Sequence, residues 1–286
     1  MLNLIDSHVH FWDPANLRYD WLAGVPAINR VFLPQQLPRQ GQGWRLDGLV
    51  FVQADCAAEQ GQAEVEWVAA LAAQHAVIVG IVAFAPLELG EGARPQLEWL
   101  SGQPMVKGVR RLIQAEAPGF AVQPDFVRGV GLLAEYGLSF DVAVRNDQLR
   151  EAIVLIRQCP GVSFVLDHIG NPDIQAGRRD PWQQDLADVA ALPNVSCKVS
   201  GVVTRADHDH WRPAELRPYI DHVLDAFGPE RVIYGSDWPV MTLAARYEQW
   251  VAALLEAAAA RPEADRQKLF RENARAFYRL PAGSGG

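Results

Sequence analysis

The sequence Leu4-Ile5-Asp6-Ser7-His8-Val9-His10 starts as an apolar strand and ends in two histidines separated by one residue. Successive side chains of a strand point to opposite faces, so His8 and His10 project to the same side, whereas a helix would separate them. Two histidines on one strand face favour a metal site or catalysis over the structural alternative, a pair of hydrogen-bonded core histidines. The stretch therefore predicts an opening strand with functional groups at its carboxyl end.

Apolar, β-branched runs recur along the chain and predict eight strands, at residues 4–6, 46–53, 77–84, 106–109, 138–144, 162–166, 195–199 and 232–234. Helical patterns lie between most of them, for example at 63–74, 125–136, 148–158, 182–191 and 215–227. Alternating strands and helices are typical of parallel βα units, and eight units predict an α/β protein with a single (β/α)8 TIM barrel. An open doubly wound sheet is the rival, but it would not bring the first and last strand ends together.

The composition is that of an ordinary globular protein, with 286 residues, 49% hydrophobic and 21% charged. The net charge of -8 argues against nucleic acid or an anionic membrane as a partner. Cys56, Cys159 and Cys197 have no C-x-x-C spacing and indicate neither a disulfide framework nor a thiolate zinc site. With no targeting or membrane-spanning run, we expect a cytoplasmic protein, and homo-oligomerisation stays open.

One domain is expected over residues 1–280, followed by a disordered tail at 281–286 that is rich in glycine. The segment 11–45 is too long for a simple barrel loop and is expected to cover the active-site mouth. Trp12, Tyr19 and Trp21 in it are either walls for a ligand or the contacts that pin the loop to the barrel.

Polar residues stand at or just beyond the predicted strand ends, where the active sites of such barrels lie. They are His8, His10, Gln53, Asp55, Arg110, Arg111, His168, Ser200 and Asp237. Closure of the barrel would bring His8, His10, His168 and Asp237 to one mouth.

Arg110 and Arg111 are neighbours on a strand, so we expect only one of them to face the mouth and anchor a substrate. An ion pair with a loop acid is the alternative for either. Trp238 is a further substrate-binding candidate.

Lysine is rare and occurs only at Lys107, Lys198 and Lys268. Lys198 either contacts substrate or meets a buried carboxylate, and for Lys107 we favour a structural pairing with Asp141 or Asp167.

A second group, Asp207, His208 and His210, follows the strand at 195–199. It resembles a set of metal ligands only superficially, and we expect these residues to lie in a solvated loop.

Five motifs carry a resemblance to a known family: D-S-H-V-H-F-W at 6–12, V-K-G-V-R-R at 106–111, F-V-L-D-H-I-G at 164–170, C-K-V-S-G at 197–201 and G-S-D-W-P at 235–239. Together they resemble the amidohydrolase superfamily of the amidohydrolase 2 type, in the sugar-lactone hydrolase branch that holds the L-fuconolactonases and L-rhamnonolactonases. The resemblance implies a (β/α)8 barrel with His8, His10, His168 and Asp237 as metal ligands. The strand at 138–144 has no histidine, which argues against a two-metal centre.

The resemblance and the ligand types lead to one expected chemistry. A divalent ion, with zinc ahead of manganese or iron, would activate a bound water for attack on a lactone carbonyl, and Asp237 would be the general base. Operation without metal stays open, with His168 and Asp237 positioning the water directly. The expected partner is a small-molecule lactone derived from a sugar acid.

Three alternatives are kept. The same scaffold could carry a non-oxidative decarboxylase, the lactone could be anionic, such as a pyrone dicarboxylate, or the barrel could bind a ligand without catalysis. Retention of a base beside the proposed metal ligands speaks against a silent binding barrel.

Overall fold

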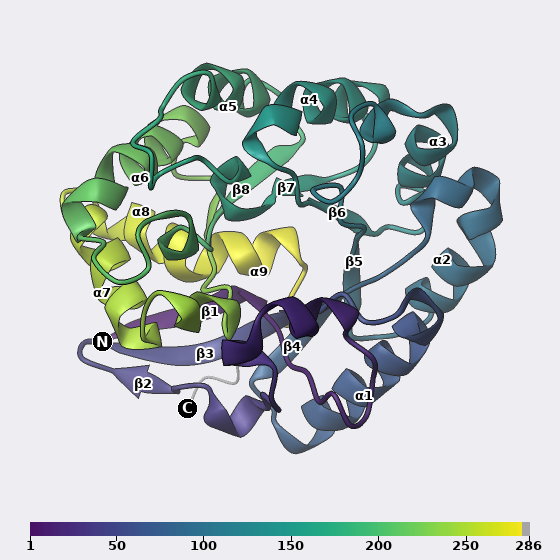
Figure 1. The fold of residues 1–286 in the computed structure, drawn as a ribbon, viewed down its shortest axis with the longest axis horizontal. Coiled ribbons are helices and arrows are strands. Elements are labelled where there is room, and N and C mark those ends of the chain that lie inside the picture. The colour runs from purple at the N-terminus through teal and green to yellow at the C-terminus, as the bar shows by residue number, and fades with distance from the viewer. Residues whose placement is uncertain (282–286) are drawn as a thin grey trace.

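Eight parallel strands form the barrel wall in the computed structural model, which describes residues 1–281 (Figure 1). They are β1 (Leu2–Val9), β3 (Trp44–Val52), β4 (Ile78–Ala83), β5 (Val106–Arg110), β6 (Ser139–Val142), β7 (Phe164–Leu166), β8 (Val195–Val199) and β9 (Val232–Tyr234). The short β2 (Gln40–Gly41) pairs antiparallel with β3, outside the barrel order. The predicted (β/α)8 barrel is confirmed.

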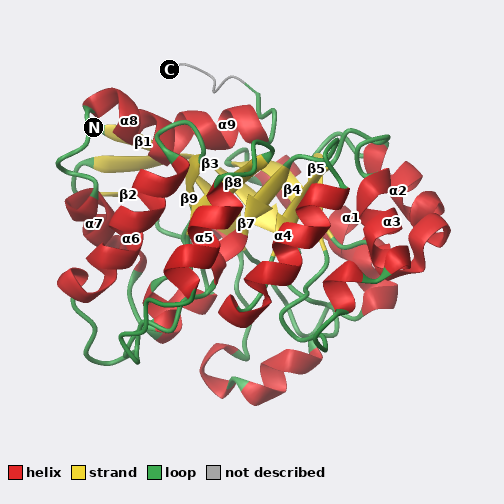
Figure 2. Ribbon diagram, turned by 90° about the horizontal axis from the view of Figure 1, so that it is seen from above, coloured by secondary structure: helices red, strands yellow, loops and turns green. Residues whose placement is uncertain are grey.

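Most helices surround the strands on the outside, and the last helix lies across one end of the barrel (Figures 1 and 2). They are α1 (Gly61–Gln74), α2 (Arg94–Ser101), α3 (Pro124–Leu132), α4 (Leu149–Gln158), α5 (Trp182–Ala190), α6 (Pro213–Phe227), α7 (Tyr247–Ala257), α8 (Glu263–Gln267) and α9 (Asn273–Phe277). The five helices proposed from sequence all form, with ends that differ by a few residues. Among the described residues, no helix is long and apolar enough to span a membrane.

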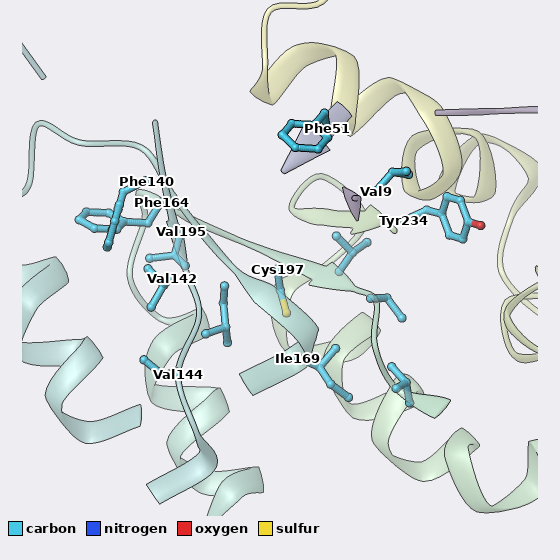
Figure 3. Packing of buried hydrophobic residues seen from close by; sticks show 14 of the residues in the cluster. Val9, Phe51, Phe140, Val142, Val144, Phe164, Ile169, Val195, Cys197 and Tyr234 are labelled. Carbon is cyan, nitrogen blue, oxygen red and sulfur yellow. The ribbon is translucent and has the colours of Figure 1, made fainter. Parts of the chain in front are cut away.

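Alternating strand residues build two separate apolar layers. The outer layer packs the strands against the helices, and Figure 3 shows part of it, including Phe140 and Phe164 on neighbouring strands with ring centroids 6.0 Å apart. The inner layer is small and includes Val50, Val165 and Tyr278. Most of the apolar packing lies between the outer face of the strands and the helices, so the barrel interior can hold polar groups.

The last helix closes the end of the barrel at which the strands begin. Arg279 follows α9 and donates hydrogen bonds to the carbonyl oxygens of Lys107 (3.2 Å) and Gly137 (2.7 Å), at the entrances to β5 and β6. Tyr278 and Leu280 join the inner apolar layer. The opposite end, where the strands finish, is left for loops.

The barrel closes through backbone bonds between β1 and the residues just after β9. The Asp237 amide donates to the His8 carbonyl (2.9 Å), and the His10 amide donates to the Trp238 carbonyl (2.7 Å). The buried Asp6 carboxylate holds the same seam, because it accepts hydrogen bonds from the Ser236 amide (2.8 Å) and the Tyr247 hydroxyl (2.9 Å). An open sheet is thereby excluded.

A bulge in β1 decides where its histidines point. Asp6 pairs with Leu49 and Val9 with Phe51, so β1 has one residue more than β3 over this stretch. Such a bulge reverses the alternation of side chains beyond it. Ile5 lies in the inner layer, and His8, three residues later, also faces the interior.

The segment 11–45 contains three short 3-10 turns, Asp20–Gly24, Pro26–Ile28 and Pro34–Gln36. Trp12 is buried and donates from Nε1 to the carbonyl of Arg30 (2.8 Å), so it pins the loop. Trp21 instead lines the cavity at the barrel mouth. The division at residue 280 stays a prediction, and residues 282–286 of the predicted tail lie outside the described residues.

We expect Asp6→Ala to lower the free energy of unfolding by about 3 kcal/mol, because the Ser236 amide and the Tyr247 hydroxyl lose a buried charged acceptor. The exposed Asp20→Ala is the control, and its loss should stay within about 1 kcal/mol because its only ion pair among residues 1–281 is with exposed Arg18. Urea unfolding measures both. Equal losses in the two variants would contradict the role of the Asp6 seam.

Candidate active site

The histidines and the aspartate expected at the mouth lie together at the carboxyl ends of β1, β7 and β9. The Asp237 carboxylate oxygen Oδ1 is 3.3 Å from His10 Nε2 and 3.8 Å from His8 Nε2. One ligand atom each from His8, His168 and Asp237 lies within 4.8 Å of the others. His10, His168 and Asp237 border a cavity of about 440 Å³.

Unusual backbone conformations turn two of these side chains inward. His168 and Asp237 have φ values of 53° and 67°, in the left-handed region that few residues other than glycine adopt. Gly201 gives them room, since a Cβ there would lie 2.6 Å from His168 Nδ1. Strained conformations of this kind persist where the surrounding structure holds them, which is common at functional sites.

Hydrogen bonds and burial leave the imidazoles neutral with nitrogen lone pairs available. His10 Nδ1 donates to the Val52 carbonyl (2.7 Å), so its Nε2 carries a lone pair toward Asp237. Burial, with the nearby Arg110 charge, lowers the pKa of His10 to about 3. Burial also holds the pKa of His8 well below its ordinary value and lowers that of His168. Neutral imidazole is the form that binds a metal.

The contact between His10 and Asp237 is the best test of whether a cation fits here. An imidazole lone pair and a carboxylate oxygen face each other at 3.3 Å with no proton of the ring between them. Such a contact is repulsive unless a proton or a cation lies near both atoms. The backbone carbonyl behind His10 is also the usual partner of a metal-ligating histidine. The donor set therefore fits a divalent ion.

Burial raises the pKa of Asp237 to about 6, and the neighbouring His168 and Arg110 oppose this rise. The carboxylate is thus still ionised at neutral pH, yet more basic than an exposed aspartate. This is the range in which a carboxylate serves as a general base.

A buried charge network lies beneath His8. Lys198 Nζ contacts Asp141 Oδ2 (2.5 Å), Asp167 Oδ1 (3.1 Å) and His8 Nδ1 (3.2 Å). Burial would raise the pKa of Asp167, but the Lys198 ammonium outweighs it and holds that pKa well below its usual range. Burial raises the pKa of Asp141 to about 6, although Lys198 opposes the rise. Lys198 is fully buried, does not line the cavity and meets buried carboxylates, which is one of the two alternatives expected for it; the structure does not show the other, a contact with substrate.

Lys107 is not part of this network. Its ammonium donates to the Pro104 carbonyl (2.9 Å), so the expected pairing with Asp141 or Asp167 is wrong. The reason is topological: Lys198 reaches the barrel interior, whereas Lys107 lies at the entrance of β5, near Arg279.

Of the two neighbouring arginines, Arg110 faces the mouth. Arg110 is buried and lines the cavity. Its Nη1 lies 3.1 Å from His8 Nε2, and its Nε has no partner among the described residues. Arg111 points outward and pairs with Glu88 (3.1 Å) and Glu116 (2.6 Å), which is the ion-pair alternative. This arrangement agrees with the expectation that only one of the two arginines faces the mouth.

Trp238 also requires a correction. Only 4% of it is exposed, and its ring packs against Phe32 (5.4 Å between centroids) and Phe11 (6.1 Å) instead of lining the cavity. The cis peptide that follows it joins Pro239. The residue helps to attach the long loop to the barrel.

Several cavity residues had no assigned role from sequence, because they come from loops. They are Asp55, Gln114, Asn171, Thr204 and Arg205. Asp167 also lacked a role, although its place beside His168 was a usable signal. Asp207, Asp209 and His210 cluster on the surface and are exposed, with Asp207 Oδ1 accepting from the amides of the other two, as expected for a solvated loop.

A closed parallel barrel with ionisable groups at the carboxyl ends of its strands is a known enzyme architecture. The amidohydrolase family profile matches residues 5–280, and the chain belongs to this family. The resemblance found in the sequence motifs is therefore confirmed.

Named relatives point in the same direction. The chain is 35% identical over 294 residues to an L-fucono-1,5-lactonase of Burkholderia multivorans, covering 97% of this chain and 96% of the relative. It is 31% identical over 288 residues to an L-fucono-1,5-lactonase of Burkholderia ambifaria, covering 98% and 97%. The crystal structure of a Burkholderia multivorans amidohydrolase with bound zinc matches with a TM-score of 0.86 and 33% identity, covering 97% of this chain and 99% of that chain.

We expect Lys198→Met to lower the free energy of unfolding by about 3–5 kcal/mol, because it leaves the buried Asp141 without a cation and removes one of the two cations beside Asp167. Lys107→Met is a matched control on a barrel strand, and its loss should stay within about 0.5 kcal/mol. Denaturant unfolding compares the two variants. A similar loss at both positions would show that the buried network does not stabilise the barrel.

Proposed function

We propose that this protein is a hydrolase that opens a small lactone derived from a sugar acid. The observation that carries the proposal is the Asp237 carboxylate, which stands on the cavity wall 3.3 Å from a neutral imidazole nitrogen and has a pKa raised by burial to about 6. The lactonase activity named for the two Burkholderia relatives supports this substrate class.

The metal would be held by His8, His10, His168 and Asp237. A divalent ion at these ligands supplies Lewis acidity, which polarises the lactone carbonyl and lowers the pKa of water. Zinc suits three nitrogen ligands and one oxygen, and manganese or iron suits them as well. The zinc in the Burkholderia multivorans amidohydrolase supports zinc as the first choice.

Asp237 would move the proton of the reaction. It accepts the proton of the attacking water as the water oxygen bonds to the carbonyl carbon, and it returns that proton to the ring oxygen as the ring carbon–oxygen bond breaks. The product is an open-chain hydroxy acid. One carboxylate thus serves as base and then as acid.

Arg110 would stabilise the charge that develops on the carbonyl oxygen. Its guanidinium lines the cavity, is fixed by a hydrogen bond to the Gln53 carbonyl (2.5 Å), and has an Nε without a partner among the described residues. A preorganised cationic donor in a buried site favours the oxyanion more than it does in water.

A pH-indicator assay tests the function directly, because each lactone that opens releases one acid. The panel contains aldonolactones and anionic lactones, with and without a chelator. The expected result is acid release from at least one aldonolactone. Release of carbon dioxide from a hydroxybenzoate, with no lactone opened, would replace the proposal with a decarboxylase.

We expect Asp237→Asn to lower kcat by about 100- to 10,000-fold, because the amide cannot accept the proton of water. Asparagine tolerates the left-handed backbone at this position (φ 67°), so the barrel should stay folded. Asp207→Asn, in the exposed cluster, is the matched control and should keep the wild-type kcat. Unchanged kcat in Asp237→Asn would rule out this general base.

Metal content gives a test that does not depend on activity. After equilibration with zinc and dialysis, His10→Ala should retain less zinc per chain than the wild type, because it removes a nitrogen that faces the centre. His210→Ala removes a histidine from the exposed cluster and should retain the wild-type amount. Elemental analysis measures both, and equal zinc in the wild type and His10→Ala would remove His10 from the ligand set.

A further inference from the structure

One carboxylate on the cavity wall has no function in the proposed reaction. Asp55 lies just beyond β3, lines the same cavity as Arg110 and Asp237, and is exposed to it. Among residues 1–281, its carboxylate makes no hydrogen bond or ion pair. An ionised acceptor that faces a ligand cavity without a protein partner is free to bind a ligand donor.

The backbone of Asp55 is held in an uncommon conformation. Its φ is 58°, in the left-handed region, and its amide donates to Gln53 Oε1 (2.5 Å). The preceding residue, Ala54, is fixed on both sides: its amide donates to Glu64 Oε1 (3.1 Å) and its carbonyl accepts from Trp21 Nε1 (2.9 Å). Three side-chain contacts thus over-determine the turn that presents the Asp55 carboxylate.

The charge of Asp55 argues for a neutral ligand group at this position on the cavity wall. Arg110 and Arg205 provide two cations, and Asp55 and Asp237 provide two carboxylates. A carboxylate on the ligand near Asp55 would meet a like charge, whereas a hydroxyl would donate a strong hydrogen bond to it.

The indole of Trp21 stands on the same wall, oriented by its bond to Ala54. An aromatic surface beside a few fixed polar groups is how binding sites orient a small ring. A lactone that carries several hydroxyls could place its apolar ring face against Trp21 and a hydroxyl against Asp55.

We propose that Asp55 determines substrate specificity: its carboxylate accepts a hydrogen bond from a ring or side-chain hydroxyl of a neutral lactone and disfavours lactones with a carboxylate at that position. This inference rests on the proposed lactonase function. Asp55 takes no part in the proton transfer, so its removal changes which lactone is preferred rather than how the ring opens.

The test compares wild type and Asp55→Asn on an aldonolactone that the wild type hydrolyses, on its singly deoxygenated analogues, and on a carboxylated lactone. For one deoxy analogue, wild type should lose about 10- to 100-fold in kcat/KM, the value of a hydrogen bond to a charged acceptor. In Asp55→Asn this preference for the hydroxylated substrate should fall at least tenfold. The carboxylated lactone should gain kcat/KM relative to the aldonolactone.

The design separates specificity from folding. Asparagine tolerates a left-handed backbone, and a ratio of two kcat/KM values measured on one preparation does not depend on the fraction of folded enzyme. Glu66→Gln removes an exposed acid of α1 that makes no ion pair with any described residue, and its ratios should equal those of wild type.

One result would contradict the role of Asp55 and another would contradict the lactonase function, and the two can be distinguished. If Asp55→Asn retains the wild-type ratio for every deoxy analogue, or lowers kcat/KM equally for all substrates, Asp55 does not select hydroxyls. If wild type itself opens none of the lactones, the proposed function fails, and this is seen before any variant is made.

Discussion

The backbone pairing between His8–His10 and Asp237–Trp238 is the constraint on which the rest of the structure depends. The same amide and carbonyl groups that close the barrel belong to residues whose side chains form the centre. The same contacts therefore close the barrel and set the geometry of the site: the barrel cannot open at this seam without separating Asp237 from the histidines. Asp6 adds buried hydrogen bonds to the seam from the helix side.

The buried charge network beneath His8 costs desolvation free energy and orients the His8 ring. Two carboxylates, Asp141 and Asp167, share the single ammonium of Lys198 in a fully buried interior, where unpaired charges are expensive. Hydrophobic residues of similar volume could pack there with less desolvation. What the network adds is a fixed orientation for His8, whose Nδ1 lies between Lys198 and Asp167 and whose Nε2 is left facing Arg110 and Asp237.

The cavity above the centre is lined by groups at or near strand ends and by groups from the following loops. Arg110 is the last residue of β5 and the Asp237 amide bonds to the His8 carbonyl of β1, whereas Asp55, Asn171 and Arg205 come from segments that follow strands. Strand ends are held by the sheet, so they suit groups that must be placed accurately for bond breaking. Loops can change without disturbing the sheet, so they suit groups that choose the ligand.

Much of this was determined by the sequence alone. Alternation along the first strand places His8 and His10 on one face, and the recurrence of strand and helix patterns implies a barrel whose strand ends meet. The adjacency of Arg110 and Arg111 implies that one faces inward. The tertiary structure decided the remainder, because the deciding partners are distant in the chain. Arg111 pairs with Glu88, so Arg110 is the arginine that faces the cavity. Asp141 pairs with Lys198 and not with Lys107. A bulge in β1 turns the histidine side chains toward the barrel interior.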